Sequence, residues 1–134
     1  MAEIKAKGGA FTVTGRSGNG DEVWKLIRAA EGIKNTDAPI FRAMLGHPDF
    51  TTPKNGEKRT GSSCAEPHAV AQLLAKGVSF KNMKLEMATD QNGSKMAECH
   101  FCAQWIHPDG KIDADFMVEK YVTSPGVLPD WCYF

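Results

Sequence analysis

Apolar and polar residues follow one another along this chain at spacings that predict both strands and helices. From Ile4 to Thr14 they alternate and pause at a Gly-Gly pair, which is typical of a short hairpin. The glycine-rich residues 15–20 predict a loop. From Asp21 onward apolar residues recur at helical spacing, so we expect a helix that Asp21 caps and that stops at Gly32.

A second helix is expected after Thr36, with Pro39 in its first turn and Gly46 at its end. Residues 47–63 hold several prolines and glycines and predict a long surface loop. Such loops are often functional when they flank a site. This loop ends immediately before Cys64, the first cysteine of the chain.

Residues 64–77 predict a helix by their alanine and leucine content, with Pro67 in the first turn and Gly77 as the C-terminal cap. Residues 83–89 predict a strand, and residues 90–93 predict a turn. The helix therefore begins at a cysteine, which matters for the chemistry considered below.

The last third of the chain is less regular. A short helix is expected from near Cys99 to Ile106, followed by a turn. The segment 112–121 fits either a strand or a helix, and we favour a helix in its second half. With helices interleaved with a few strands and no internal repeat, residues 1–134 predict one α/β sandwich domain.

Composition limits the class of protein without identifying a substrate. The 134 residues are 42% hydrophobic and 24% charged, which is ordinary for a globular domain. No stretch has the roughly 18 apolar residues that cross a bilayer, so we expect a soluble protein without a membrane partner. Sixteen basic and sixteen acidic residues balance, which argues against a protein that coats nucleic acid, although a local cleft could still be positive.

Four cysteines narrow the chemistry: Cys64, Cys99, Cys102 and Cys132. A domain of this size does not need disulfide bonds, and a Cys-x-x-Cys pair is typical of metal or redox chemistry. Three thiolates suit zinc, and a catalytic zinc keeps its fourth position for water. Glu66, two residues after Cys64, can reach that water without binding the metal. We expect Cys132 to be a packed thiol.

Both halves of this candidate site lie where we expect helices to begin. The amino end of a helix carries partial positive charge, which would offset part of the negative charge of zinc with three thiolates. Cys64, Cys99 and Cys102 are therefore predicted to hold Zn²⁺, with Glu66 as the acid-base group beside it.

The motif resembles a known family. Cys64-Ala65-Glu66 with Cys99-His100-Phe101-Cys102 is similar to the zinc-dependent cytidine deaminase superfamily, whose signature is H-x-E followed by P-C-x-x-C. Cys64 replaces the histidine of that signature, and Glu98 stands where a proline usually precedes the pair. The Cys-Ala-Glu-Pro run before a helix of small residues looks most like the bacterial toxin deaminases, in particular the YwqJ-like branch. The resemblance covers about residues 60–107.

The resemblance implies a three-layer α/β/α sandwich around a central mixed sheet. In that fold paired strands would precede the zinc helix, where the pattern over residues 21–45 predicts two helices, so the N-terminal architecture stays open. The resemblance also implies that Glu66 moves protons between a water activated by zinc, the ring nitrogen and the leaving ammonia, at C4 of cytosine or C6 of adenine. Ala65 would line the base pocket, and His68 is a candidate for touching the substrate.

The same resemblance implies a substrate and a setting. We expect deamination of cytosine to uracil in single- or double-stranded nucleic acid, by a toxin that bacteria export into target cells and that an immunity protein could cover. A free nucleoside or nucleotide is the alternative substrate, which the neutral charge favours. Another alternative is a non-enzymatic interaction module in which Cys64, His68, Cys99 and Cys102 form a closed structural zinc site. Trp105 is expected in the core rather than as a stacking platform for a base.

Overall fold

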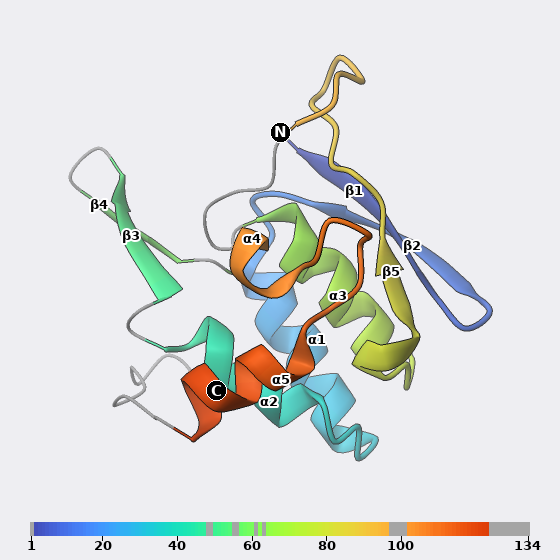
Figure 1. The fold of residues 1–134 in the computed structure, drawn as a ribbon, viewed down its shortest axis with the longest axis vertical. Helices are drawn as coiled ribbons and strands as arrows, with labels where there is room; N and C mark the ends of the chain where they lie inside the picture. The colour runs from blue at the N-terminus through green and yellow to red at the C-terminus, as the bar shows by residue number, and fades with distance from the viewer. Residues whose placement is uncertain are drawn as a thin grey trace.

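The computed structural model describes residues 2–47, 50–54, 57–60, 62, 64–96 and 102–123, and the side chains of residues 51–54 and 57–60 are not included in this description. It is a mixed α/β fold in which helices pack against one three-stranded antiparallel sheet (Figure 1). In chain order the strands and helices are β1 (Glu3–Gly8), β2 (Phe11–Arg16), α1 (Gly20–Gly32), α2 (Ala38–Leu45), β3 (Thr51–Lys54), β4 (Glu57–Thr60), α3 (Ala65–Ala75), the 3₁₀ turn η3 (Phe80–Asn82), β5 (Met83–Leu85), α4 (Cys102–Trp105), α5 (Ala114–Met117) and the π-helical turn η4 (Val118–Val122).

The sheet has the order β2-β1-β5, and both neighbouring pairs are antiparallel. The predicted N-terminal hairpin is confirmed, with Glu3 opposite Arg16 at one end and Gly8 opposite Phe11 at the other. The α/β class is also confirmed. The predicted central mixed sheet is wrong, because in the described residues β1 receives a hairpin partner on one side and an antiparallel β5 on the other, which leaves no parallel pair.

The third strand contains a bulge. Beyond Leu85 the chain stays beside β1, and Thr89 and Glu3 each donate their N–H to the other's carbonyl at 2.8 Å. From the pair Ala6–Leu85 to the pair Glu3–Thr89, β1 advances three residues while the third strand advances four. One extra residue is therefore inserted in this strand, which is the definition of a β-bulge. The predicted strand over residues 83–89 follows this path, although only its first part is regular.

Glycines let helix α3 approach the sheet closely. A Cβ on Gly15 of β2 would lie 2.3 Å from the Ala65 carbonyl oxygen and 2.6 Å from the Ala69 nitrogen. A Cβ on Gly8 of β1 would lie 2.6 Å from the Val78 side chain, near the other end of the helix. Because real Cβ atoms do not approach backbone atoms this closely, β2 needs glycine at position 15, where α3 crosses it, whereas a Cβ at Gly8 would clash with side chains of Val78 and Leu73.

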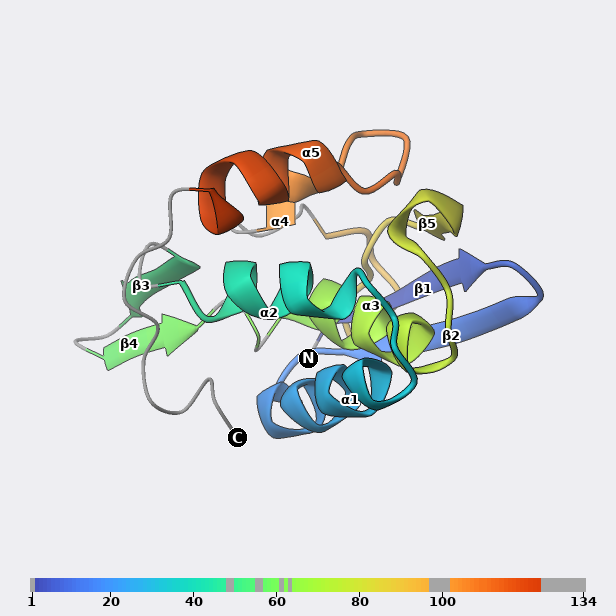
Figure 2. The ribbon, with the colours of Figure 1, turned by 90° about the horizontal axis from the view of Figure 1, so that it is seen from below.

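The helices lie on one side of the sheet, so the fold has two layers where three were expected. Figure 2, seen from below, shows α3 between α1 and the pair α4 and α5, and Figure 1 shows the sheet to the upper right of α3. Along β1 the inward residues are buried, whereas Glu3, Lys5 and Lys7 on the opposite face are exposed. Within the described residues no helix covers that face, and the alternation of apolar and polar residues along β1 is what a half-solvated antiparallel sheet requires.

A turn closes part of the outer edge of β5. The Leu85 N–H donates to the Gly110 carbonyl at 2.9 Å. A Cβ on Gly110 would lie 2.0 Å from the Leu85 carbonyl oxygen, and Gly110 has a φ of +86°. Both the contact and the left-handed backbone therefore require glycine at this position. The predicted turn after Ile106 is confirmed by this arrangement.

Most predicted helices are confirmed, and three details differ. Helix α1 begins after Asn19 without a side-chain hydrogen bond at its cap, so Asp21 lies inside the first turn and does not cap the helix. The predicted loop over residues 47–63 contains the hairpin β3–β4, which Figure 1 shows extending away from the other elements. The Asn-Gly dipeptide at 55–56 is a common hairpin signal in a sequence, and the loop prediction did not use it. The short helix expected from near Cys99 is described only from Cys102 onward.

The core lies between α3 and the helices around it. Trp105 is fully buried and its ring meets Phe41 of α2 edge to face at 5.6 Å, so its predicted place in the core is confirmed. Tyr121 of η4 is also buried and packs against Phe50 and Phe116. The helix predicted in the second half of the segment 112–121 is confirmed by α5 and η4.

Candidate metal centre

The first half of the predicted zinc site lies at the amino end of α3. Cys64 is the N-cap residue, with an extended backbone (φ −74°, ψ 160°), and only 6% of its surface is exposed. Glu66 is in the first turn and is 4% exposed. Because the N–H groups of this turn have no partner within the helix, the thiol and the carboxylate lie where negative charge is stabilised.

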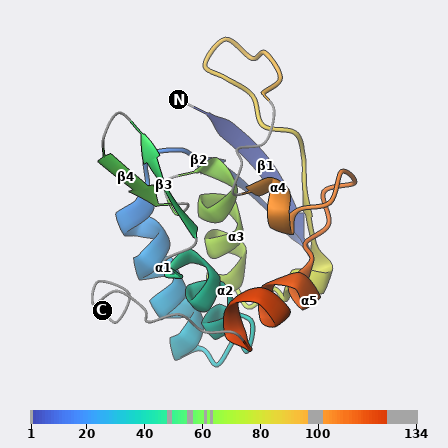
Figure 3. The same ribbon diagram turned by 60° about the vertical axis from the view of Figure 1, so that its left-hand side comes forward.

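The second half lies at the start of α4. Cys102 is the first residue of this helix and is completely buried. Figures 1 and 3 both show α4 beside the amino end of α3, so Cys64 and Cys102 belong to the same region of the molecule. Cys99, the third predicted ligand, lies outside the described residues. Within the described ranges no three His, Cys, Asp or Glu side chains gather as metal ligands.

The described donors, the thiols of Cys64 and Cys102, fit zinc. Two buried cysteines at helix starts suit a soft, thiolate-binding metal, and a buried carboxylate lies on the same turn as one of them. A carboxylate this deep in a protein is uncommon unless hydrogen bonds or a cation compensate for its lost hydration. Cys64 and Cys102, joined by Cys99 from the connecting segment, would hold the ion.

His68 is held by groups from two other elements. Its Nδ1 accepts a hydrogen bond from the Arg16 backbone N–H at 2.9 Å, and its Nε2 lies 2.8 Å from a carboxylate oxygen of Glu22. Because a carboxylate only accepts hydrogen bonds, Nε2 carries the hydrogen in this arrangement. Both ring nitrogens are thus engaged. His68 is buried, because β2 and α1 meet over it.

The partners of His68 could not have been found from local sequence. Arg16 is 52 positions and Glu22 is 46 positions away in the chain. Both partners come from the segment around the start of α1, where the predicted loop and helix meet. The histidine therefore joins the end of β2, the first turn of α1 and α3, and in this structure its nitrogens face protein groups.

Ala65, predicted to line a base pocket, is 1% exposed. Its carbonyl oxygen faces Gly15 of β2 across the closest contact between the sheet and α3. The backbone on that side of the first turn is therefore occupied by the sheet. Any base pocket would have to form on the side of Ala65 that faces away from β2.

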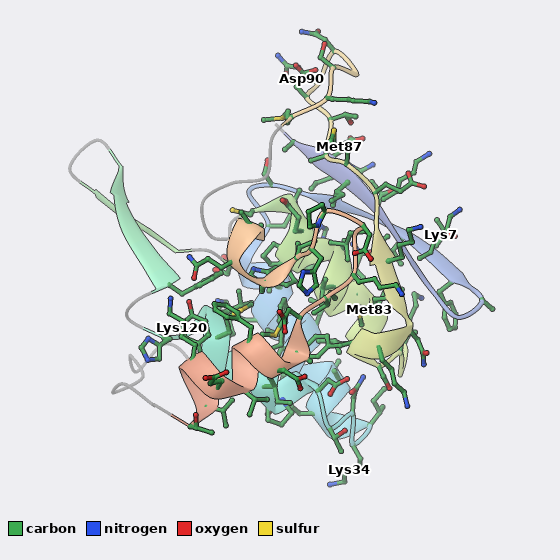
Figure 4. All side chains as sticks on the ribbon, viewed as in Figure 1. Lys7, Lys34, Met83, Met87, Asp90 and Lys120 are labelled. Carbon is green, nitrogen blue, oxygen red and sulfur yellow. The ribbon has the colours of Figure 1, made fainter. Side chains whose placement is uncertain are left out.

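A groove that the sequence did not indicate lies beside the third strand, where the Gly110 turn packs against it. Its volume is about 490 Å³. Two of its methionines, Met87 at the bulge and Met96, are exposed by 60% and 38%. Figure 4 labels Met87 between Met83 and the Asp90 turn. The groove contains none of the described site residues; it is lined by Leu85, Glu86, Met87, Met96, Ala103, Ile106, Pro108 and Gly110.

Comparison with protein-family models, curated proteins and solved structures found no match to this chain. Among the described residues no helix is both long and apolar enough to cross a membrane.

Proposed function

We propose that this chain is a zinc-dependent hydrolytic deaminase that acts on a nucleobase, converting cytosine to uracil in a nucleic acid. The observation that carries the proposal is the buried Glu66 in the first turn of α3, two residues after the buried Cys64 at its N-cap. The burial of Cys102 at the start of α4, beside this turn, supports the same reading (Figure 3). The resemblance of the Cys-Ala-Glu and Cys-x-x-Cys motifs to the cytidine deaminase superfamily supplies the reaction.

In this mechanism Cys64, Cys99 and Cys102 would hold the ion, which would supply the Lewis acidity that makes a water reactive at neutral pH. Glu66 accepts the proton of the attacking water and delivers it to the ring nitrogen of the base. As the oxygen bonds to the carbon that bears the amino group, Glu66 takes the second proton from the new hydroxyl group and gives it to the amino group. The carbon–nitrogen bond then breaks, ammonia leaves and the oxygen becomes the carbonyl of uracil. A buried carboxylate suits this role because burial excludes competing water, and the lower local dielectric that results strengthens its interaction with the charge that develops on the base.

The hydrogen-bond partners of His68 favour a zinc site with an open coordination position over a closed Cys3His site. A closed Cys3His zinc site would need one ring nitrogen of His68 to face the metal. Nδ1 already accepts the Arg16 N–H and Nε2 lies against Glu22. Three thiolates would then leave a coordination position for water, as catalysis requires.

The experiment that tests the proposal is a product assay on the purified, zinc-loaded protein. Single-stranded DNA, duplex DNA, RNA, free cytidine and free adenosine are incubated separately, and uracil or hypoxanthine is sought by mass spectrometry. We expect uracil in a polynucleotide from the native chain, none from Glu66→Gln, and native activity from Glu119→Gln, which changes an exposed glutamate of η4.

The alternatives predict different results in the same assay. Product from free cytidine alone would replace the polynucleotide with a nucleoside substrate. One zinc per chain with no product from any substrate would favour an interaction module with a structural zinc. The toxin setting is part of the proposal and rests on the motif resemblance alone: export from a bacterium, action in a target cell, and an immunity protein that neutralises the domain.

A further inference from the structure

The face of the sheet that points away from the helices carries an unbalanced positive charge. Lys5 and Lys7 of β1 and Lys84 of β5 are all exposed on it. The strand register places Lys7 directly opposite Lys84. Like charges directly opposite one another destabilise a sheet, so this pair works against folding. We call Lys5, Lys7 and Lys84 the lysine face.

Neighbouring acids do not neutralise this face. Glu3, at the far end of β1, is bound to Arg16 at 3.1 Å. Glu86 is adjacent to Lys5, whose carbonyl accepts the Glu86 N–H, but the two side chains form no ion pair. None of the three lysines forms an ion pair with an acid in the described part of the chain. Since the whole chain has zero net charge, the excess is local to this face.

Protection of the sheet edge does not account for all three lysines. Lysines on edge strands prevent unwanted pairing with other chains, and this accounts for Lys84 on β5. Lys5 and Lys7 belong to β1, which is the central strand and already has a partner on each side. Contact with solvent accounts for polar residues at these two positions but not for the choice of lysine at both, and an anionic partner would account for the shared positive charge.

We propose that the lysine face binds the phosphate backbone of single-stranded nucleic acid, at a distance from the reacting base. The inference rests on the proposed function and deepens it, because it selects a polynucleotide over a free nucleoside as substrate. Lysines act as point charges for phosphates and carry no base information. The outward positions of the three strands hold only charged residues and threonines, so no aromatic ring stacks a base there.

The position of the face relative to α3 fits this role. At the Arg16 end, β2 touches the first turn of α3 through Gly15, so the edge of the sheet there borders the helix that carries Glu66. Lys7 lies four residues from Glu3 along β1, about 13 Å at the usual rise of a strand. A single-stranded nucleic acid whose target base lies at Glu66 would cross the sheet edge near Arg16. Its phosphates would reach the lysine face only if several nucleotides flank that base.

The test measures binding of a fluorescein-labelled thirty-residue oligothymidylate by fluorescence anisotropy at several salt concentrations. This probe has no amino group to remove, so its binding is independent of the chemistry. The variant Lys7→Gln/Lys84→Gln removes the opposed pair. The control Lys25→Gln/Arg28→Gln removes the same charge from exposed positions of α1. Thermal unfolding checks that both variants are folded.

We expect the lysine-face variant to bind at least about fivefold more weakly, with a salt slope lower by about 1.4, because each phosphate contact on a single strand contributes about 0.7. The control variant should keep native affinity and slope. Equal affinity of the native chain and the lysine-face variant, or an equal loss in both variants, would overturn the inference. Binding to vesicles of phosphatidylcholine and phosphatidylserine that requires Lys7 and Lys84, without oligothymidylate binding, would overturn it in favour of a membrane surface.

Failure of the two proposals can be distinguished. If no substrate is deaminated but the lysine-face variant loses oligothymidylate binding, the proposed enzyme activity fails and the nucleic-acid surface stands. If the lysine-face variant forms uracil at the native rate in both long and six-residue oligonucleotides, the activity stands and the surface fails. If the lysine-face variant deaminates long oligonucleotides more slowly than the native chain but six-residue oligonucleotides at the native rate, the activity and the surface are both supported.

Discussion

Substitution of Gly15 by alanine tests whether the contact between β2 and α3 fixes the candidate site. The new Cβ would lie 2.3 Å from the Ala65 carbonyl oxygen and within 2.7 Å of two Ala69 atoms. Two of these three atoms belong to the backbone of α3, so the clash cannot be relieved by a side-chain rotation. Overpacking of this kind costs up to about 3 kcal/mol. Alanine regains about 0.5–1 kcal/mol because glycine is unfavourable in a strand.

The expected net loss in free energy of unfolding for Gly15→Ala is therefore about 2 kcal/mol. Urea denaturation of the zinc-loaded protein, with a constant m-value, measures it. Gly32→Ala is the matched control, since a Cβ there meets no atom within 4 Å and α1 ends at this residue. The control should be as stable as the native chain or more stable by up to about 1 kcal/mol. A Gly15→Ala protein within 0.5 kcal/mol of the native one would refute the close contact.

Four other changes give distinct results. Glu66→Gln should lower the deamination rate by about 10²–10⁴ with zinc content unchanged, and loss of the zinc along with activity would instead make Glu66 a ligand. Cys102→Ser should bind less than one zinc per chain by elemental analysis, and full retention of zinc would remove it from the ligand set. His68→Ala should destabilise the fold by about 1–3 kcal/mol in urea while keeping one zinc per chain, and loss of zinc would support the closed site. Asn35→Ala should lower the free energy of unfolding by a similar amount, because the Asn35 amide donates to the carbonyls of Leu74 and Val78 at 3.0 and 3.1 Å. An unchanged urea midpoint would show that water replaces the amide.

Local signals in the sequence were sufficient for the elements that depend on local structure. The Gly-Gly pair near the start predicted the first hairpin, and the helical spacing after Asp21 predicted α1. Pro39 predicted the first turn of α2, where Pro occupies one of the first two positions. Gly77 predicted the end of α3. Its φ is +86°, in the left-handed region that glycine adopts without strain.

Features that depend on distant contacts were beyond that reasoning. The third layer, a second layer of helices on the other face of the sheet, was inferred from a family resemblance, and no pattern of residues required it. The bulge before Thr89 arises from the register between β1 and the third strand, which no short window of sequence contains. The same is true of His68, whose orientation depends on Glu22 and on a backbone group of β2. For the candidate site, the sequence predicted the helix start at Cys64 but not the burial of Glu66.

The turn at Gly110 has a consequence for how chains meet one another. An edge strand with unpaired N–H and carbonyl groups is a template on which another chain can add a strand. Here the Leu85 N–H is taken by Gly110 and the Leu85 carbonyl lies under the Gly110 backbone, so that stretch of β5 offers no template. The segment that contains α4 thus ends in a turn that also protects the sheet from self-association. A larger residue at Gly110 would be expected to loosen this turn and promote aggregation as well as lower stability.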